Sequence, residues 1–151
     1  MDLAREQGVP VTGADANADI VAAARSCGFE IVHDGTLAVL DGKPAGSVGV
    51  ITAFHLIEHL SASQRLRFFM GASRALCARG FLLLEWPNIE NPRVAHYTFW
   101  LDPTHGSPLP AELAVFMARY AGFTEVMLNR IDDGQPVGFE AADLGLWARK
   151  P

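Results

Sequence analysis

The sequence predicts an α/β fold with a doubly wound, mostly parallel sheet and a C-terminal antiparallel strand pair. Three observations lead to this prediction. Short apolar runs alternate with helix-like segments through the first 87 residues. The near-continuous apolar run Val48–Phe54 is typical of a strand buried on both faces in the middle of a parallel sheet. Only a glycine-rich loop separates the strand-like runs Phe123–Arg130 and Asp143–Arg149, so they are expected to pair antiparallel.

The first 47 residues are expected to form two short strands, two helices and a helical turn. Gly8 and Gly28 each follow a helix-like segment, where glycine is a common C-cap. The polar stretch Asp15–Asn17 can cap the second helix. In chain order we expect a helix at Met1–Gln7, a strand at Val9–Ala14, a helix at Ala18–Cys27, a strand at Glu30–His33, a helical turn at Thr36–Leu40 and a loop at Asp41–Ser47.

Beyond the central strand, a helix at Leu60–Ala78 is expected to end at Gly80, with its arginines away from an apolar stripe. That stripe consists of Leu66, Phe69, Met70, Ser73, Leu76 and Cys77. A buried strand at Phe81–Trp86 follows. The irregular stretch Asn88–Pro110 is long for a loop, and loops of this length are usually functional or disordered. A helix at Ala111–Ala121 precedes the antiparallel pair.

Length and composition indicate one soluble domain spanning residues 1–151. The formal net charge of −5, with no basic cluster, argues against a nucleic-acid surface. Two cysteines, Cys27 and Cys77, are too few for a disulfide scaffold and favour a reducing compartment. No signal peptide or membrane-spanning run is visible. We therefore expect a cytoplasmic protein with no membrane span.

Several stretches together resemble class I S-adenosylmethionine-dependent methyltransferases. They are the strand ending in Gly13-Ala14-Asp15, the break at Asp34, and the run ITAFHLIEHL at residues 51–60. The stretch NPRVAHYTFWLDPTHGSPLPAELAVFMARYAGF, residues 91–123, is similar to a bacterial subgroup associated with cell-surface polysaccharide synthesis. The resemblance covers nearly the whole chain. It implies S-adenosyl-L-methionine as cofactor and O-methylation of a saccharide or surface-polymer precursor.

The chain departs from this family at its N-terminus. Family members begin with a strand and a Gly-x-Gly-type loop that receives the methionine part of the cofactor, whereas Met1–Gly8 matches only the latter part of the following helix. We therefore expect an N-terminally truncated domain that binds cofactor weakly or not at all. The missing strand normally lies between the strands expected at Val9–Ala14 and Val48–Phe54. These strands must then pair directly or leave exposed edges.

Two alternatives to an active methyltransferase stay open. One is a catalytically inactive methyltransferase-like domain that acts in protein association, with a second copy or a partner chain covering exposed sheet edges. The other is a Rossmann-type nucleotide-binding module without methyl transfer, which the aromatic loop around Asp102–His105 argues against.

The acids that follow the first two strands are candidates to hold the cofactor's adenosine. Asp15, with Ala16 and Asn17 beside it, could accept hydrogen bonds from both ribose hydroxyls, although this stretch could equally serve as a helix N-cap. Asp34 could accept from the adenine amine while the amide of Gly35 donates to the ring. Asp-Gly is also an ordinary turn, which is the structural alternative for that pair.

Phe54 and His55 stand where the central strand meets a loop. Ligands of open α/β sheets bind outside the carboxyl ends of strands, so these residues are expected to line the cofactor and substrate mouth. The alternative for His55 is a side chain satisfied by a local carbonyl.

The segment His55-Leu-Ile-Glu58-His59 has metal-ligand residue types at helical spacing. It mimics an inverted zinc-peptidase motif, but it begins at the end of a buried strand rather than inside a long helix. Some small-RNA and quinone-pathway O-methyltransferases bind a divalent ion near a Glu-x-x-Glu-His motif, where this chain has His55 in place of the first acid. We therefore expect no metal, and expect Glu58 or His59 to face the methyl acceptor as base or orienting group.

Asp102 and His105 bracket Pro103-Thr104 in the long loop. His105 could take a hydroxyl proton during methyl transfer, with Asp102 holding its tautomer. The structural alternative is that Asp102 and Thr104 only cap turns. The neighbouring aromatic residues could form an apolar lid, a platform for a sugar, or part of the core. They are Tyr97, Phe99 and Trp100.

Overall fold

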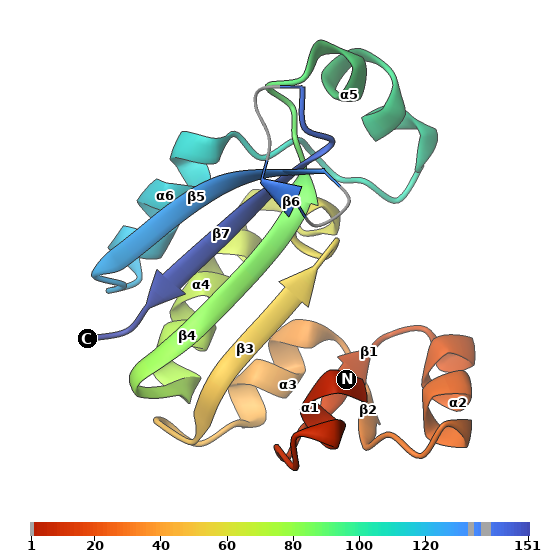
Figure 1. Cartoon of the computed structure of the whole chain (residues 1–151), viewed down its shortest axis with the longest axis vertical. Helices are drawn as coiled ribbons and strands as arrows, with labels where there is room; N and C mark the ends of the chain where they lie inside the picture. The colour runs from red at the N-terminus through yellow and green to blue at the C-terminus, as the bar shows by residue number, and fades with distance from the viewer. Residues whose placement is uncertain (1, 133–134, 137–139) are drawn as a thin grey trace. The chain divides into compact units, whose positions relative to one another are not determined.

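A computed structural model of the chain describes residues 2–132, 135–136 and 140–151 (Figure 1). Its contacts divide the chain into two compact units, Met1–Lys43 and Pro44–Pro151. Whether these units together make one domain stays a prediction. No helix in the part of the chain that the structure describes is both long and apolar enough to cross a membrane.

The N-terminal unit contains a two-stranded parallel sheet and three helices. In chain order its elements are α1 (Asp2–Glu6), β1 (Gly13–Asp15), α2 (Ala18–Ser26), β2 (Ile31–His33) and α3 (Thr36–Gly42). The strand expected at Val9–Ala14 is therefore wrong in its first four residues. The ladder with β2 pairs only residues 13–15 with 31–33, and Pro10 has no amide hydrogen to donate. The helical turn expected at Thr36–Leu40 continues to Gly42.

The C-terminal unit contains a five-stranded mixed sheet. Its elements are β3 (Val48–Phe54), η1 (Ile57–His59), α4 (Ala62–Ala75), β4 (Leu76–Pro87), α5 (Pro92–His96), η2 (Thr98–Leu101), α6 (Ala111–Tyr120), β5 (Glu125–Asp132), β6 (Gln135–Pro136) and β7 (Asp143–Arg149). The strand order is β3-β4-β7-β5-β6. β3 is parallel to β4, and the antiparallel pairing of β5 with β7 is confirmed. The α/β class is thus confirmed.

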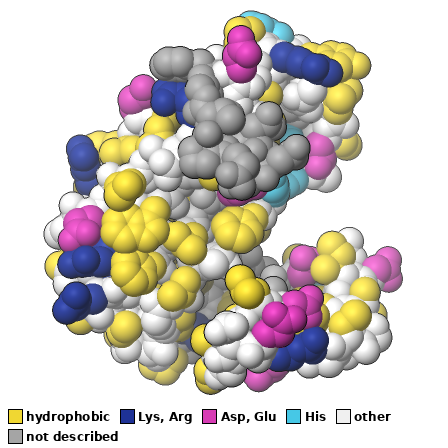
Figure 2. Space-filling model, viewed as in Figure 1, with side chains coloured by type: hydrophobic (Ala, Val, Ile, Leu, Met, Phe, Trp, Pro, Cys, Tyr) yellow, Lys and Arg dark blue, Asp and Glu magenta, His cyan; other side chains and the backbone are white. Residues whose placement is uncertain are grey.

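The prediction of a mostly parallel, doubly wound sheet is not met in this unit. β7 runs antiparallel to both of its neighbours, because it follows β5 without an intervening helix. Figure 1 shows α4 and α6 on one face of the sheet. Core side chains from alternate strand positions pack on that side, including Leu82, Leu84 and Trp86 of β4. In Figure 2, hydrophobic side chains gather on the opposite, near face, over the strands of this sheet.

The prediction that Val48–Phe54 is a central strand buried on both faces is wrong. β3 is an edge strand, with the side chain of Val50 52% exposed and that of Phe54 58% exposed. Within the described residues no ladder joins β3 to the β1–β2 sheet.

The boundary between α4 and β4 also differs from the prediction. The helix ends at Ala75 rather than Ala78, and Gly80 lies inside β4 instead of ending the helix. A Cβ atom at Gly80 would lie 3.0 Å from the carbonyl oxygens of Cys77 and Gly49, so the close approach of β3 requires a glycine here. The ladder to β3 shifts register at the same place.

The buried face of α4 is rotated from the predicted stripe. Arg65, Phe68, Phe69, Ala72 and Ala75 are buried, whereas Met70 is exposed. The burial of an arginine, explained below, moves the stripe by about one residue.

Candidate functional site

In the N-terminal unit, the structure brings the two predicted cofactor acids to one edge of a sheet. Asp15 ends β1 and Asp34 directly follows β2, and parallel strands end at a common edge. The amide of Asp34 donates to the carbonyl oxygen of Asp15 at 3.2 Å. The backbones of these two residues are therefore adjacent.

Local hydrogen bonds show what else these residues do. Asn17 is the N-cap of α2, and the Oδ1 atom of Asp15 accepts from the amide of Asn17 at 2.7 Å. Asp34 accepts from the amide of Gly35 at 2.7 Å, and Gly35 is the N-cap of α3. The carbonyl oxygen of Ala16 lies 3.1 Å from His33 Nε2. Each carboxylate offers about four acceptor positions, so one local bond leaves capacity for a ligand.

In the C-terminal unit, His55 follows β3 with a left-handed backbone, at φ +49°. Such a conformation is uncommon for a non-glycine residue and often occurs at functional sites. The Nδ1 atom lies 3.3 Å from Glu58 Oε1, and the Nε2 atom lies 3.4 Å from Glu85 Oε1 and 4.0 Å from Asp143 Oδ1. The alternative of a histidine satisfied by a local carbonyl is therefore wrong: this ring faces three carboxylates.

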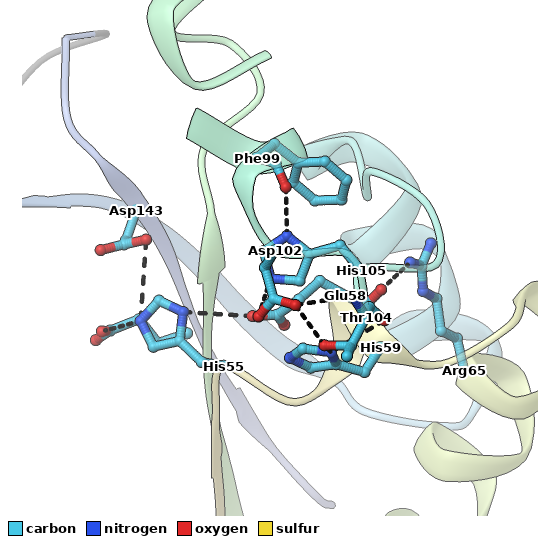
Figure 3. A network of polar contacts seen from close by, with 10 residues as sticks. His55, Glu58, His59, Arg65, Phe99, Asp102, Thr104, His105 and Asp143 are labelled. Atoms are coloured by element: carbon cyan, nitrogen blue, oxygen red, sulfur yellow. Dashed lines mark hydrogen bonds and ion pairs between the residues drawn. The ribbon is translucent and has the colours of Figure 1, made fainter. Parts of the chain in front are cut away.

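The other predicted polar residues of this unit meet in one place, which we name the histidine–carboxylate cluster. It comprises Glu58, His59, Asp102, Thr104 and His105 (Figure 3). η1 supplies the first two residues, and the segment after η2 supplies the others. The amide of Gly106 donates to the carbonyl oxygen of Glu58 at 2.9 Å, which joins the two segments.

The tautomers of both histidines follow from their hydrogen bonds. His59 Nδ1 lies 3.2 Å from the carbonyl oxygen of Thr104, and His105 Nδ1 lies 2.7 Å from that of Phe99. A carbonyl oxygen only accepts, so Nδ1 carries the proton in each ring. The Nε2 atom of each neutral imidazole therefore keeps a lone pair, available to a proton or a cation.

Asp102 is linked to His59 by hydrogen bonds, whereas its contact with His105 is a longer ion-pair distance. Its Oδ1 atom accepts from the hydroxyl of Thr104 at 2.6 Å, and that hydroxyl lies 3.0 Å from His59 Nδ1. The distance from Asp102 Oδ2 to His105 Nε2 is 3.8 Å, too long for a hydrogen bond. The expectation that Asp102 holds the tautomer of His105 is thus corrected: the carbonyl of Phe99 does so. Asp102 also caps a turn, because the amide of Thr104 donates to it.

The hydrogen bonds from the hydroxyl and amide of Thr104 lower the pKa of Asp102 from its ordinary value. Thr104→Val removes the hydroxyl donor and keeps the amide, so the pKa of Asp102 should rise. The lowered folded-state pKa means that Asp102 stabilises the fold at neutral pH and that this contribution fades as pH falls through that pKa. The variant should lose part of this pH dependence. An NMR titration of the Asp102 carboxyl measures the shift, with Thr98→Val as control; identical titrations would contradict the assignment.

Glu58 is fully buried, at 0% exposure. Among the described residues, neither of its carboxylate oxygens has a hydrogen-bond partner. Its nearest recorded polar contact is His55 Nδ1, at 3.3 Å. A buried carboxylate without hydrogen bonds is costly, so its retention calls for an explanation.

Arg65 is the residue that the sequence analysis missed. Its side chain is 2% exposed and donates to the carbonyl oxygens of Ile57 at 2.8 Å, Pro108 at 3.3 Å and Ser107. It therefore ties η1 to the segment beyond the cluster. Burial lowers the pKa of Arg65, and the charge of Glu58 opposes that shift. The sequence does carry a signal for its burial: Arg65 stands at helical spacing from Phe68, Phe69 and Ala72, which form the buried face of α4.

The aromatic residues before the cluster separate into two groups. Phe99 is buried and packs against His105, with ring centroids 4.5 Å apart, so it belongs to the core. Tyr97 and Trp100 are exposed, which leaves the predicted lid or sugar platform as a proposal for these two residues. A pocket of about 600 Å³ between α6 and β5 contains none of the predicted site residues.

Solved structures of methyltransferases share this architecture. An S-adenosylmethionine-dependent methyltransferase from Archaeoglobus fulgidus has a TM-score of 0.87 at 20% identity, covering 99% of this chain and 80% of that chain. One from Mesorhizobium loti has a TM-score of 0.77 at 15% identity, covering 99% and 84%. PigF, solved with S-adenosylhomocysteine (SAH), has a TM-score of 0.70 at 17% identity, covering 100% and 46%.

The chain has the methyltransferase fold. No family model matches the sequence, and no curated protein matches it significantly. At these identities the likeness establishes the fold and not the reaction, because one fold carries many functions. It also gives no support to the polysaccharide-associated subgroup. Function must therefore be argued from the residues at the strand ends and in the cluster.

Proposed function

We propose that the chain is an S-adenosyl-L-methionine-dependent methyltransferase that methylates a hydroxyl of a saccharide or surface-polymer precursor. The observation that carries this proposal is the position of Asp15 and Asp34 at adjacent ends of parallel strands in a methyltransferase fold. Ligands of open α/β sheets bind beyond such strand ends. The saccharide acceptor rests on the resemblance of residues 91–123.

The residues of the N-terminal unit fit an adenosine. Asp15 would accept from the ribose hydroxyls, with Ala16 and Asn17 beside it. Asp34 would accept from the adenine amine, and the Gly35 amide would have to exchange its bond to Asp34 for one to the ring. Both carboxylates keep acceptor capacity beyond their local bonds. Phe54 and His55, at the end of β3, are proposed to line the cofactor and substrate mouth.

The cluster in the C-terminal unit supplies the acceptor side. When bound, the cofactor supplies a sulfonium methyl group, and the acceptor oxygen bonds to that carbon as the carbon–sulfur bond breaks. The Nε2 lone pair of His59 or His105 would take the proton released by the hydroxyl. Asp102 orients His59 through Thr104. The protein contributes mainly positioning and exclusion of water.

Binding of SAH tests the cofactor half of the proposal. An NMR titration is suited to this test, because it reports which residues meet the ligand. The amides of Asp15, Asn17, Asp34 and Gly35 should shift, and Asp15→Asn should weaken binding at least about tenfold, or about 1.4 kcal/mol. Asp19→Asn, at another acid of the same unit, is the matched control. Unshifted strand-end amides, or equal affinity in Asp15→Asn, would contradict the proposal.

Protein association is a second candidate function, and the exposed edge of β3 favours it. Val50 and Phe54 are both more than half exposed on this strand, and no ladder covers its outer side within the described residues. Unpaired edges attract other strands. A homo-oligomer would give a concentration-dependent mass in sedimentation equilibrium, and Val50→Lys should reduce it. A monomeric mass at all concentrations tested would argue against association between copies of this chain.

A further inference from the structure

We propose that Glu58, His59 and His105 bind a divalent transition-metal cation. These residues each offer one ligand atom, and the three atoms lie within 4.8 Å of one another. The helical spacing of His55, Glu58 and His59 suggested His55 as the third ligand, and no metal was expected. The structure instead places His105, from a distant segment, beside Glu58 and His59 (Figure 3). This proposal replaces that expectation.

The buried carboxylate is the first argument for a cation. Glu58 is fully buried, and among the described residues its two oxygens receive no hydrogen bond. The buried Arg65 directs its guanidinium at main-chain carbonyl oxygens, including that of Glu58 at 3.5 Å. The recorded ion-pair contact of Glu58 is with the half-exposed ring of His55, at 3.3 Å. A divalent cation would supply a direct partner inside the cluster, and buried charges are normally paired or bound to metal.

The histidine tautomers are the second argument. Both rings donate from Nδ1 to carbonyl oxygens, so both keep the Nε2 lone pair that a metal ligand needs. Metal-binding histidines commonly make this second hydrogen bond, because it fixes the ring and makes the ligand nitrogen more basic. The contact from Asp102 through Thr104 to His59 adds a carboxylate to this support.

The ligand types indicate the class of cation. Two imidazoles and one carboxylate suit Zn²⁺, Co²⁺ or Fe²⁺ better than Mg²⁺ or Ca²⁺, which prefer oxygen ligands. Tetrahedral Zn²⁺ needs ligand atoms about 3.4 Å apart, so the three atoms must close by at most about 1.4 Å. Three protein ligands leave a position for an acceptor oxygen, and with both Nε2 lone pairs on the cation the acceptor would lose its proton to water instead of to His59 or His105. That role rests on the proposed methyl transfer, whereas cation binding does not.

The test is a titration of the full chain with Co²⁺, followed by visible absorption, and with Zn²⁺, followed by calorimetry. We expect one equivalent to bind, with a cobalt spectrum that lacks thiolate bands from Cys27 and Cys77. Glu58→Gln and His105→Ala should each weaken binding at least about tenfold. His96→Ala, an exposed histidine outside the cluster, is the control and should bind as the unmodified chain does. Circular dichroism of the metal-free variants verifies folding.

Failure to bind either cation at millimolar concentration overturns the inference, and so does equal affinity in folded Glu58→Gln and His105→Ala. If His105→Ala does not fold, the near-isosteric Glu58→Gln decides alone. An SAH titration of the same sample separates this inference from the proposed function. SAH binding without cation binding would refute only the metal site, and cation binding without SAH binding would refute only the cofactor assignment.

Discussion

Arg65→Met is expected to lower the free energy of unfolding of the C-terminal unit by about 3–5 kcal/mol. The guanidinium is buried and donates to several main-chain carbonyl oxygens of η1 and residues 107–108. Methionine fills a similar volume but makes none of these hydrogen bonds, so the carbonyl oxygens of Ser107 and Pro108 lose their recorded donor. Those of Ile57 and Glu58 keep the amides of Leu60 and Gly106. The substitution also removes the positive charge that interacts with the buried Glu58. Urea unfolding followed by tryptophan fluorescence reports on this unit, since Trp86, Trp100 and Trp147 all lie in it.

Arg67→Met is the matched control, because Arg67 is exposed on the same helix. Its effect should stay within about 0.5 kcal/mol. Equal effects of the two substitutions would show that the buried hydrogen bonds of Arg65 do not hold the fold. Since Arg65 fixes both segments of the cluster, Arg65→Met should also broaden the NMR signals of the His59 and His105 rings.

Trp86→Ala is expected to destabilise the same unit by about 3–5 kcal/mol. The side chain of Trp86 is fully buried in the core. Its Nε1 atom donates to the carbonyl oxygen of Leu109 at 2.9 Å, so it also anchors the end of the long loop that carries the cluster. Alanine would leave a large cavity and an unpaired carbonyl. Urea unfolding followed by circular dichroism is the measurement.

Trp147→Ala is the control for Trp86→Ala. It shows whether the loss of stability comes from the cavity at Trp86 or follows from the removal of any tryptophan in this sheet. Trp147 is half-buried on β7 and packs on Phe81 with ring centroids 5.2 Å apart. Its removal should cost less than the removal of Trp86. The loss of stability in Trp86→Phe should lie between those of Trp147→Ala and Trp86→Ala, because phenylalanine keeps most of the volume and loses the hydrogen bond. If Trp147→Ala proves the more damaging change, the burial argument fails.

Element types could be predicted from the sequence wherever a local pattern determines them. The bounds of β3 and β7 match the predicted Val48–Phe54 and Asp143–Arg149, because apolar runs between turn residues identify strands. The exposure of β3 could not be predicted in this way, since it depends on which strand lies beside it. Gly80 inside β4 is a similar case. Its requirement for glycine comes from the Gly49 backbone, thirty-one residues away.

For the candidate site too, the part determined by strand order could be predicted and the part determined by loop folding could not. Parallel strand ends place Asp15 and Asp34 together, and this follows from topology alone. The meeting of Glu58 and His59 with His105 depends on how a long loop folds back, which residue spacing does not encode. Arg65 was assigned to an exposed face because arginine is rarely buried. Its burial is explained by the main-chain carbonyls of residues 57–58 and 107–108, to which its guanidinium donates.

The place of β7 between β4 and β5 has a consequence for synthesis of the protein. All residues of the cluster are translated before β7, yet β4 cannot complete its ladder with β7 until Arg149 has been made. Until then β4 and β5 each have one side without a ladder, and unpaired strand edges attract other strands. Insertion of β7 therefore joins two strand pairs, β3–β4 and β5–β6, into one continuous sheet.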